Sequence, residues 1–279
     1  MTSLAKRLLI LFVILLGLFL GAATPSTYAS SSSGQNSSST ESAIEEDDAP
    51  SSLSLYYFGI FYGPTLGRSD ELHPALDTRN YLTLNSSLKK GTVFGVTVGW
   101  NWQGIPNETP TLRDPFLKLG RSDLLPPGSL SWYGDLRVHL PVTQESRDRD
   151  LWMGLQTFHS LLWEPGKVAG AGLSVSVRYN RFGGEGQGDD WEYYLGPSVF
   201  WNFSPRLGLN VLFEWGAGRP YGQNTGLLLS NGLDVEPGLN WRLNNHLLLN
   251  PYLTIPLDQT STELTGGPSL GMTLSWQWL

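Results

Sequence analysis

One pair of neighbouring side chains could in principle carry out hydrolytic chemistry. Ser160 follows His159, and a serine becomes a strong nucleophile only when a base within hydrogen-bond reach accepts its proton. Residues 150–162 alternate between apolar and polar side chains, which predicts a strand. Because neighbours in a strand point to opposite faces, we expect His159 and Ser160 to lie apart, and we predict no catalytic residue here.

Metal and thiol chemistry have no support in the sequence. The chain contains no cysteine, which excludes disulfides, thiolate metal sites and a cysteine nucleophile. The other histidines are scattered, without the spacing typical of a metal site; they are His73, His139 and His246. We predict no metal, no cofactor and no enzyme activity.

Charged side chains at every second position predict a polar channel lining instead. Asp135, Arg137 and His139 alternate along one segment, so they would share one face of a strand. By the same alternation, the predicted lumen-facing set is Asp135, Arg137, His139, Arg178, Glu192, Glu214, Asp234, Glu236 and Arg242. Such charges tune the selectivity of an open channel, whereas in a closed lumen they would pair with one another. Their mixed signs argue against a strongly anion-selective pore.

An internal repeat indicates what kind of element carries these charges. Residues 197–213 and 237–253 each alternate between apolar and polar side chains, stop at a short turn and alternate again. This pattern predicts a hairpin whose strands each present one apolar face. The matching positions include Pro197 with Pro237, Trp201 with Trp241, Leu209 with Leu249 and Asn210 with Asn250. We interpret Pro197 and Pro237 as bulges or as points where a strand leaves a membrane.

The remainder of the chain continues the same pattern. Alternating segments predict strands at 53–63, 79–88, 92–102, 115–123, 129–140, 150–162, 168–181, 191–203, 206–217, 230–243, 246–257 and 266–279. Most are long enough to cross a bilayer as tilted strands, and short connectors alternate with long ones. The predicted fold is therefore all-β, a transmembrane antiparallel up-and-down β-barrel of about 12 strands, with 10 or 14 as alternatives. Both chain ends would then lie on the side of the short turns.

The strands of a soluble β-sandwich also alternate between apolar and polar side chains, so the placement of the tryptophans is what distinguishes the predicted membrane barrel from it. Each tryptophan falls close to an end of a predicted strand, where amphipathic rings would form two belts at the membrane interfaces. The predicted belt residues are Trp100, Trp102, Trp132, Trp152, Trp163, Trp191, Trp201, Trp215, Trp241, Trp276 and Trp278. A propeller can repeat at a similar period, but each copy here holds two strands and not four.

The N-terminal part of the chain has a different composition. Lys6 and Arg7 precede an apolar run and a small-residue stretch that ends at Ala29, which is typical of a secretory signal peptide at 1–29. Residues 30–52 are rich in serine and acidic residues, and we predict a disordered lead-in before a barrel at 53–279. The formal charge of −7 and the absence of a basic stripe give nucleic-acid binding no support.

Taken together, these segments resemble Gram-negative outer-membrane β-barrel proteins, with a weaker similarity to small porin-like transporter barrels. The likeness includes the last strand, where Leu270, Met272, Leu274, Trp276 and Trp278 alternate before the extra residue Leu279. The resemblance implies export to the cell outer membrane, contact with outer-membrane lipid, and recognition of the C-terminal strand by the barrel-assembly machinery.

The resemblance also raises one enzymatic alternative. An outer-membrane phospholipase family places a histidine two residues before Ser-Asn-Gly, but here Leu228 precedes Ser230-Asn231-Gly232. A lipid hydrolase is therefore a remote alternative. The main hypothesis is a passive channel or transporter for small polar or amphipathic solutes, and its competitor is a structural or surface-recognition barrel with a closed lumen.

Overall fold

The structure is a computed structural model, and it describes the chain with gaps at the N-terminus and in several connections. The described residues are 53–65, 76–89, 91–103, 110–122, 124–166, 168–184, 186–222, 229–257 and 268–278. The predicted signal peptide (1–29), the predicted disordered lead-in (30–52) and His73 lie outside them.

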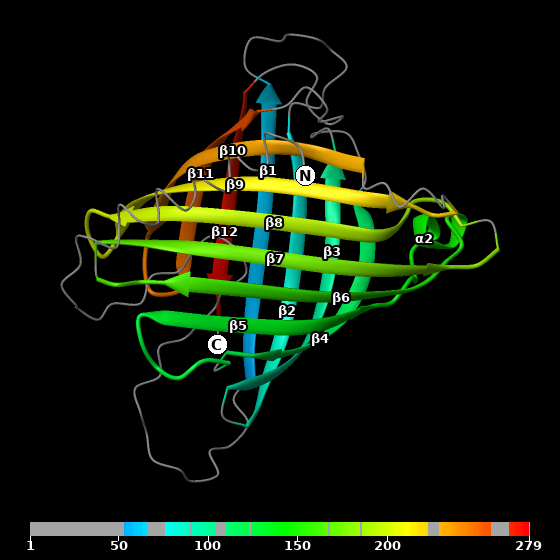
Figure 1. The fold of residues 1–279 in the computed structure, drawn as a ribbon, viewed down its shortest axis with the longest axis horizontal. Coiled ribbons are helices and arrows are strands. Elements are labelled where there is room, and N and C mark those ends of the chain that lie inside the picture. The colour runs from blue at the N-terminus through cyan, green and yellow to red at the C-terminus, as the bar shows by residue number, and fades with distance from the viewer. Residues whose placement is uncertain are drawn as a thin grey trace.

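The described part of the chain forms a closed ring of twelve antiparallel strands (Figure 1). Every strand pairs with its neighbours in the sequence, and β1 closes the ring against β12, so the all-β, up-and-down barrel of twelve strands is confirmed. The strands are β1 (Leu53–Thr65), β2 (Asp77–Lys89), β3 (Thr92–Gln103), β4 (Thr111–Arg121), β5 (Leu130–His139), β6 (Leu151–Trp163), β7 (Ala169–Phe182), β8 (Asp189–Asn202), β9 (Leu207–Pro220), β10 (Leu229–Arg242), β11 (Leu247–Pro256) and β12 (Ser269–Gln277).

One short helix, α2 (Gln144–Asp148), lies between β5 and β6. Thr143 caps its N-terminus by accepting a hydrogen bond from the backbone N–H of Ser146. Within the described ranges, no helix has the length and apolar character needed to span a membrane.

The fourth strand differs most from its predicted bounds. β4 begins at Thr111, whereas the alternation predicted a start at 115. Its pairing with β3 shifts by one residue between Thr97 and Gly99, which leaves an extra residue in β4 near Asp114 and Pro115. A bulge of this kind breaks the two-residue period of a strand. The residues before the bulge therefore do not continue the alternation, which is why the sequence did not predict that they belong to the strand.

The prolines inside strands do not form the bulges that we predicted as one possibility. Pro197 pairs with Leu173, and Pro237 pairs with Val211, in unbroken register with their neighbours. On the other side of β10, pairing with β11 passes from Val235 directly to Gly238 without a change of offset. Each proline lacks a donor, so the ladder loses a local pairing while the strand keeps its residue count.

The burial of side chains is the reverse of that in a soluble protein. Buried residues on the inner face include Thr83, Thr97, Ser160, Ser176, Asn210 and Asn250. Exposed residues on the outer face include Leu84, Val96, Val98, Leu136, Leu209 and Leu239. An exterior of exposed apolar side chains around a polar interior is the arrangement of a barrel that faces lipid.

Candidate functional site: a charged lumen

Cross-strand register places all nine predicted lumen residues on the inner face. Side chains directly opposite each other in a ladder share a face, and the register pairs Arg178 with Glu192 and Glu214 with Asp234. Glu236 pairs with Leu212, next to the Glu214 position. The acidic residues therefore gather on β9 and β10, and we call Glu214, Asp234 and Glu236 the acidic wall.

A buried ion pair occupies the inner face of β5. Arg137 Nε donates to Asp135 Oδ1 at 2.7 Å, and Arg137 Nη2 donates to Asp135 Oδ2 at 2.9 Å. The two side chains are 8% and 1% exposed. The Arg137 guanidinium lies 5.5 Å from the ring centre of Phe116 and 4.7 Å from that of Phe158. Two hydrogen bonds and two aromatic faces hold this cation against the wall.

Arg178 and Glu192 lie in a second polar group on β7 and β8. Arg178 Nε donates to Asn180 Oδ1 at 2.8 Å, and Asn180 Nδ2 donates to Glu192 Oε1 at 2.5 Å. The Arg178 and Glu192 charges themselves are 4.0 Å apart. Arg178 lies against Gly154, where an added Cβ would be 3.1 Å from the guanidinium nitrogens Nε and Nη2.

His139 belongs to a third polar group, on β5 to β7. Its Nε2 shares a hydrogen bond of 2.8 Å with Gln156 Oε1, and its ring lies 5.0 Å from Phe116. This histidine is buried and lies among side chains of β4 to β6. Its partner Gln156 donates onward to Ser176 Oγ at 2.7 Å, so a chain of polar contacts follows the inner face.

Two further cations, which the sequence analysis missed, point into the lumen from β4. Arg113 pairs with Gly99, and Lys118 pairs with Gly95 and Arg137, all on the inner face. Arg113 Nη1 donates to Asn101 Oδ1 at 3.3 Å, and its guanidinium lies 5.6 Å from the Tyr81 ring. We call Arg113, Lys118, Arg137 and Arg178 the basic wall. Alternation after the β4 bulge was the signal that could have identified Lys118, whereas Arg113 lies before the bulge and outside the predicted strand.

Tyrosines surround the acidic wall. Tyr194 Oη donates to Glu214 Oε1 at 2.7 Å, and Thr254 Oγ1 donates to Glu236 Oε1 at 2.7 Å. Tyr252 pairs with Gly238 on the inner face of β11. From β1, Tyr62 interacts electrostatically with both glutamates, and Arg79 of β2 lies 5.0 Å from the Tyr62 ring centre.

The internal repeat produces a hydrogen-bonded group of its own. Asn250 Nδ2 donates to Asn210 Oδ1 at 2.8 Å, although 40 residues separate the two in the chain. It also lies 3.0 Å from Asn240 Oδ1. Arg242, the last predicted lumen residue, ends β10 and pairs with Leu248 on this same inner face.

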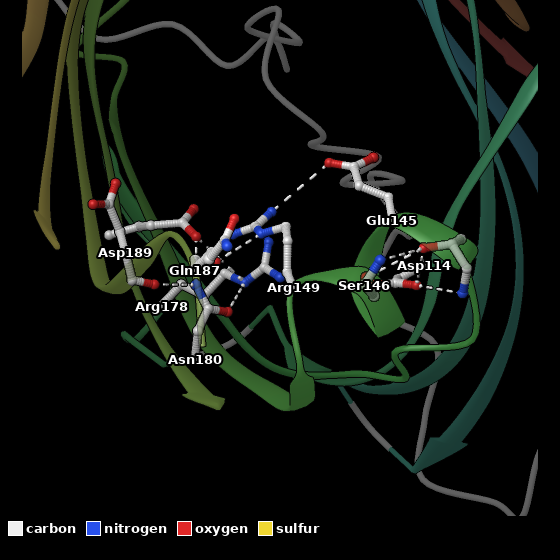
Figure 2. A network of polar contacts seen from close by, with 10 residues as sticks. Asp114, Glu145, Ser146, Arg149, Arg178, Asn180, Gln187 and Asp189 are labelled. Carbon is white, nitrogen blue, oxygen red and sulfur yellow. Dashed lines mark hydrogen bonds and ion pairs between the residues drawn. The ribbon is translucent and has the colours of Figure 1, made fainter. Parts of the chain in front are cut away.

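The segment that contains α2 is attached to the inner wall through one carboxylate (Figure 2). Asp114 Oδ1 accepts hydrogen bonds from the backbone N–H groups of Val142 and Thr143, each at 3.1 Å, and from Thr143 Oγ1 at 2.9 Å. Asp114 Oδ2 accepts from Ser146 Oγ. Four donors on one carboxylate make Asp114 the anchor of this segment.

The other end of this segment contacts the β7–β8 connection. Arg149 Nε donates to the carbonyl of Gln187 at 3.0 Å, and the backbone N–H of Gly183 donates to the carbonyl of Asp150 at 2.8 Å. Figure 2 shows Arg149 between α2 and the Arg178 and Asn180 side chains. Two connections at one end of the barrel are thus joined beside the basic wall.

The predicted belt tryptophans face outward wherever the register defines a face, and most lie near strand ends. Trp163 ends β6, and Trp201 and Trp241 are each the second-last residue of their strands. Trp215 lies farther from an end, because β9 extends to Pro220 and not to the predicted 217. Tyr57 bridges two others on the exterior, with ring centres 6.3 Å from Trp100 and 6.5 Å from Trp278.

The residues considered for hydrolysis are not arranged for it. His159 faces outward, and its Nδ1 lies 3.3 Å from Trp132 Nε1. Ser160 is buried on the inner face, opposite Tyr133. Ser230 and Gly232 flank a register shift in β10. The described residues contain no group of three or more histidine, aspartate or glutamate side chains that could hold a metal ion.

Comparison with known proteins adds a likeness in fold. No family model matches the sequence, and no curated protein matches it either. Among solved structures, an outer-membrane channel from Pseudomonas putida F1 superposes with a TM-score of 0.56 at 12% identity, over 85% of this chain and 100% of that one. At this identity the likeness shows the fold alone, a closed β-barrel like that of the Pseudomonas channel.

Two other solved barrels are less similar. The outer-membrane protein OmpT of Vibrio cholerae, in its trimer form, has a TM-score of 0.43 at 8% identity, over 82% of this chain and 99% of that one. The NanC porin has a TM-score of 0.48 at 9% identity, over 81% of this chain and 100% of that one.

Proposed function

We propose that the protein is an outer-membrane channel that passes small polar or amphipathic solutes passively. The observation that carries this proposal is the reversed burial, with polar and charged side chains inside and exposed apolar side chains outside. The core of a soluble protein is mainly apolar and rarely contains residues such as the buried Asp135, Arg137 and Asn250. A path for polar solutes, in contrast, needs a polar and charged lining.

The fold is consistent with this proposal. A solved protein with a similar fold is described as an outer-membrane channel. A ring of twelve strands is wider than eight-stranded barrels, which side chains fill, and narrower than the open porins of 16–18 strands. We therefore propose a narrow path for small solutes, with outer-membrane lipid around the exterior and recognition of β12 by the barrel-assembly machinery.

A barrel with a closed lumen and a structural or surface-recognition role is the second candidate. It is favoured by the ion pairs of Arg137 with Asp135 and of Arg178 with Glu192, because charges that satisfy each other can simply fill a lumen. The contacts that join α2 to the β7–β8 connection add to this case. Against it stand Arg113 and Lys118, for which the described residues provide no carboxylate within ion-pair distance.

Solute flux into proteoliposomes separates the two candidates. We expect vesicles that contain the protein to swell in isosmotic mannitol faster than empty vesicles, and to swell more slowly in a tetrasaccharide than in mannitol. A narrow open lumen accounts for both results. Swelling in mannitol that never exceeds that of empty vesicles would contradict the channel and support the closed barrel.

A further inference from the structure

We propose that the lumen selects zwitterionic solutes of the amino-acid class, with the carboxylate directed to β4 and the ammonium directed to β9 and β10. This inference rests on the proposed channel function and adds a substrate class to it. It is carried by two sets of charges of opposite sign that lie on opposite sides of the ring and have no ion-pair partners among the described residues.

The ring order places the two sets across the lumen from each other. β4 and β10 are separated by six steps in either direction around the closed ring of twelve strands. Arg113 and Lys118 face inward from β4, while Glu236 faces inward from β10 and Glu214 from the adjacent β9. A solute between these strands therefore has cations on one side and carboxylates on the other.

These four charges differ from the other lumen charges in their partners. Arg137 and Arg178 have Asp135 and Glu192 as counter-ions. In the described part of the chain, no oppositely charged group lies within ion-pair distance of Arg113, Lys118, Glu214 or Glu236. Neutral groups form hydrogen bonds with three of them: Asn101 accepts from Arg113, Tyr194 donates to Glu214 and Thr254 donates to Glu236. Asp135 acts on Lys118 and Arg79 acts on Glu214 at longer range. No ion pair within the described residues neutralises any of the four charges, so each can still attract a solute.

An unsatisfied acceptor lies beside Lys118. Asn85 is 7% exposed, and its Oδ1 has no hydrogen-bond partner in the described structure. Asn85 Oδ1 and Lys118 Cε converge over Gly95, within 2.5 and 2.6 Å of the position that a Cβ would take there. A buried acceptor without a donor costs free energy. Lys118 can donate to the carboxylate of a solute, and Asn85 can accept from an N–H or O–H group of that solute other than its ammonium, such as the side-chain amide of glutamine.

The opposite side has the features expected for an ammonium group. Tyr194 contacts Glu214, and Tyr62 and Tyr252 both interact electrostatically with Glu214 and Glu236. Carboxylates with aromatic rings beside them are a favourable environment for an organic cation. Because each side attracts one end of a zwitterion, a solute with both charges gains from both, and a simple anion or cation gains from one and is repelled by the other.

The test compares glutamine with mannitol, which are of similar size, in proteoliposomes of the full chain. We expect swelling in isosmotic glutamine to be at least about threefold faster than in mannitol, since one favourable charge contact near water is sufficient for such a factor. Lys118→Gln and Glu236→Gln should each reduce this ratio towards one. In a KCl gradient, Lys118→Gln should shift the reversal potential towards cation preference and Glu236→Gln towards anion preference.

Arg206→Gln is the matched control, because Arg206 is exposed in the turn between β8 and β9; it should leave the glutamine-to-mannitol ratio unchanged. Equal swelling in glutamine and mannitol would overturn zwitterion selection while leaving the channel intact. A ratio that Lys118→Gln and Glu236→Gln leave unchanged would also overturn it. Swelling in neither solute would instead reject the channel function, and this inference with it.

Discussion

At the scale of single residues, the lumen combines charges that are neutralised with charges that are not. The Arg137–Asp135 pair is bidentate, buried and enclosed by two aromatic rings. Lys118, on the adjacent strand, has no such partner among the described residues. The first arrangement contributes to the rigidity of the wall, and the second leaves a charge that can act on a solute.

The buried pair predicts an asymmetric response to mutation. Arg137→Ala should lower the free energy of unfolding by about 3–5 kcal/mol, because it leaves the Asp135 charge buried without a counter-ion. The double variant Arg137→Met with Asp135→Asn should cost much less, since it removes both charges. Urea unfolding in lipid vesicles measures both. Equal losses in the two variants would show that packing, and not the unpaired charge, dominates at this site.

The assignment of inner and outer faces can be tested at two neighbouring positions. Val235 faces outward in the middle of β10, opposite Phe213, whereas Leu212 faces inward from β9, opposite Glu236. Val235→Arg should cost about 2–4 kcal/mol of unfolding free energy, because it places a cation in lipid near the bilayer centre. Leu212→Arg makes the same type of change beside a carboxylate and should cost far less. Similar costs at both positions would contradict the assigned faces.

At the scale of elements, regular alternation made most of the barrel predictable from the sequence. Eleven of the twelve strands have starts within about three residues of their predicted positions. The exception is β4, where the bulge near Asp114 and Pro115 shifts the pairing by one residue. Arg113 lies before this bulge, outside the predicted strand, so no face could be assigned to it.

The contacts between elements could not be predicted in the same way. Alternation gives a face but not a cross-strand partner, because the partner depends on the register of the closed ring. The pairing of Arg178 with Glu192 and the grouping of Glu214 with Asp234 are results of that register. The attachment of α2 to Asp114 depends on a bulge and a helix cap, and neither follows a repeating pattern.

Because Asp114 anchors α2, its side chain should hold this segment in place without being needed for the barrel itself. Asp114→Ala removes the acceptor for Val142, Thr143 and Ser146, so residues 142–149 should exchange their amide hydrogens faster while the strands remain protected. We also expect a larger single-channel conductance, because a released segment would no longer be held against the basic wall. Asp148→Ala, at an exposed position of the same helix, is the control. Unchanged exchange in Asp114→Ala would show that other contacts hold the segment.

At the scale of the whole molecule, the exterior is suited to lipid. Exposed leucine and valine side chains cover the outer face, and eleven tryptophans are distributed along the chain, most of them near strand ends. A water-soluble protein would not expose so much apolar surface. The polar interior and the apolar exterior together suit a barrel whose outer surface contacts hydrocarbon.

Tryptophan fluorescence provides a direct test of this placement. In vesicles of brominated lipid, we expect strong quenching of the tryptophan emission, because most of the rings face outward at or near the membrane interfaces. Aqueous iodide should quench the same emission weakly. The reverse result, with strong iodide quenching and little effect of bromine, would place the tryptophans in water and contradict a lipid-facing exterior.

Single-channel recording of the refolded chain in a planar bilayer is the sharpest test of the claim that the charged lumen conducts. We expect discrete conductance steps in KCl, with a reversal potential that Lys118→Gln and Glu236→Gln shift in opposite directions. A barrel that is folded by circular dichroism and inserted in the bilayer, yet carries no current at any applied voltage, would contradict the claim and favour the closed barrel.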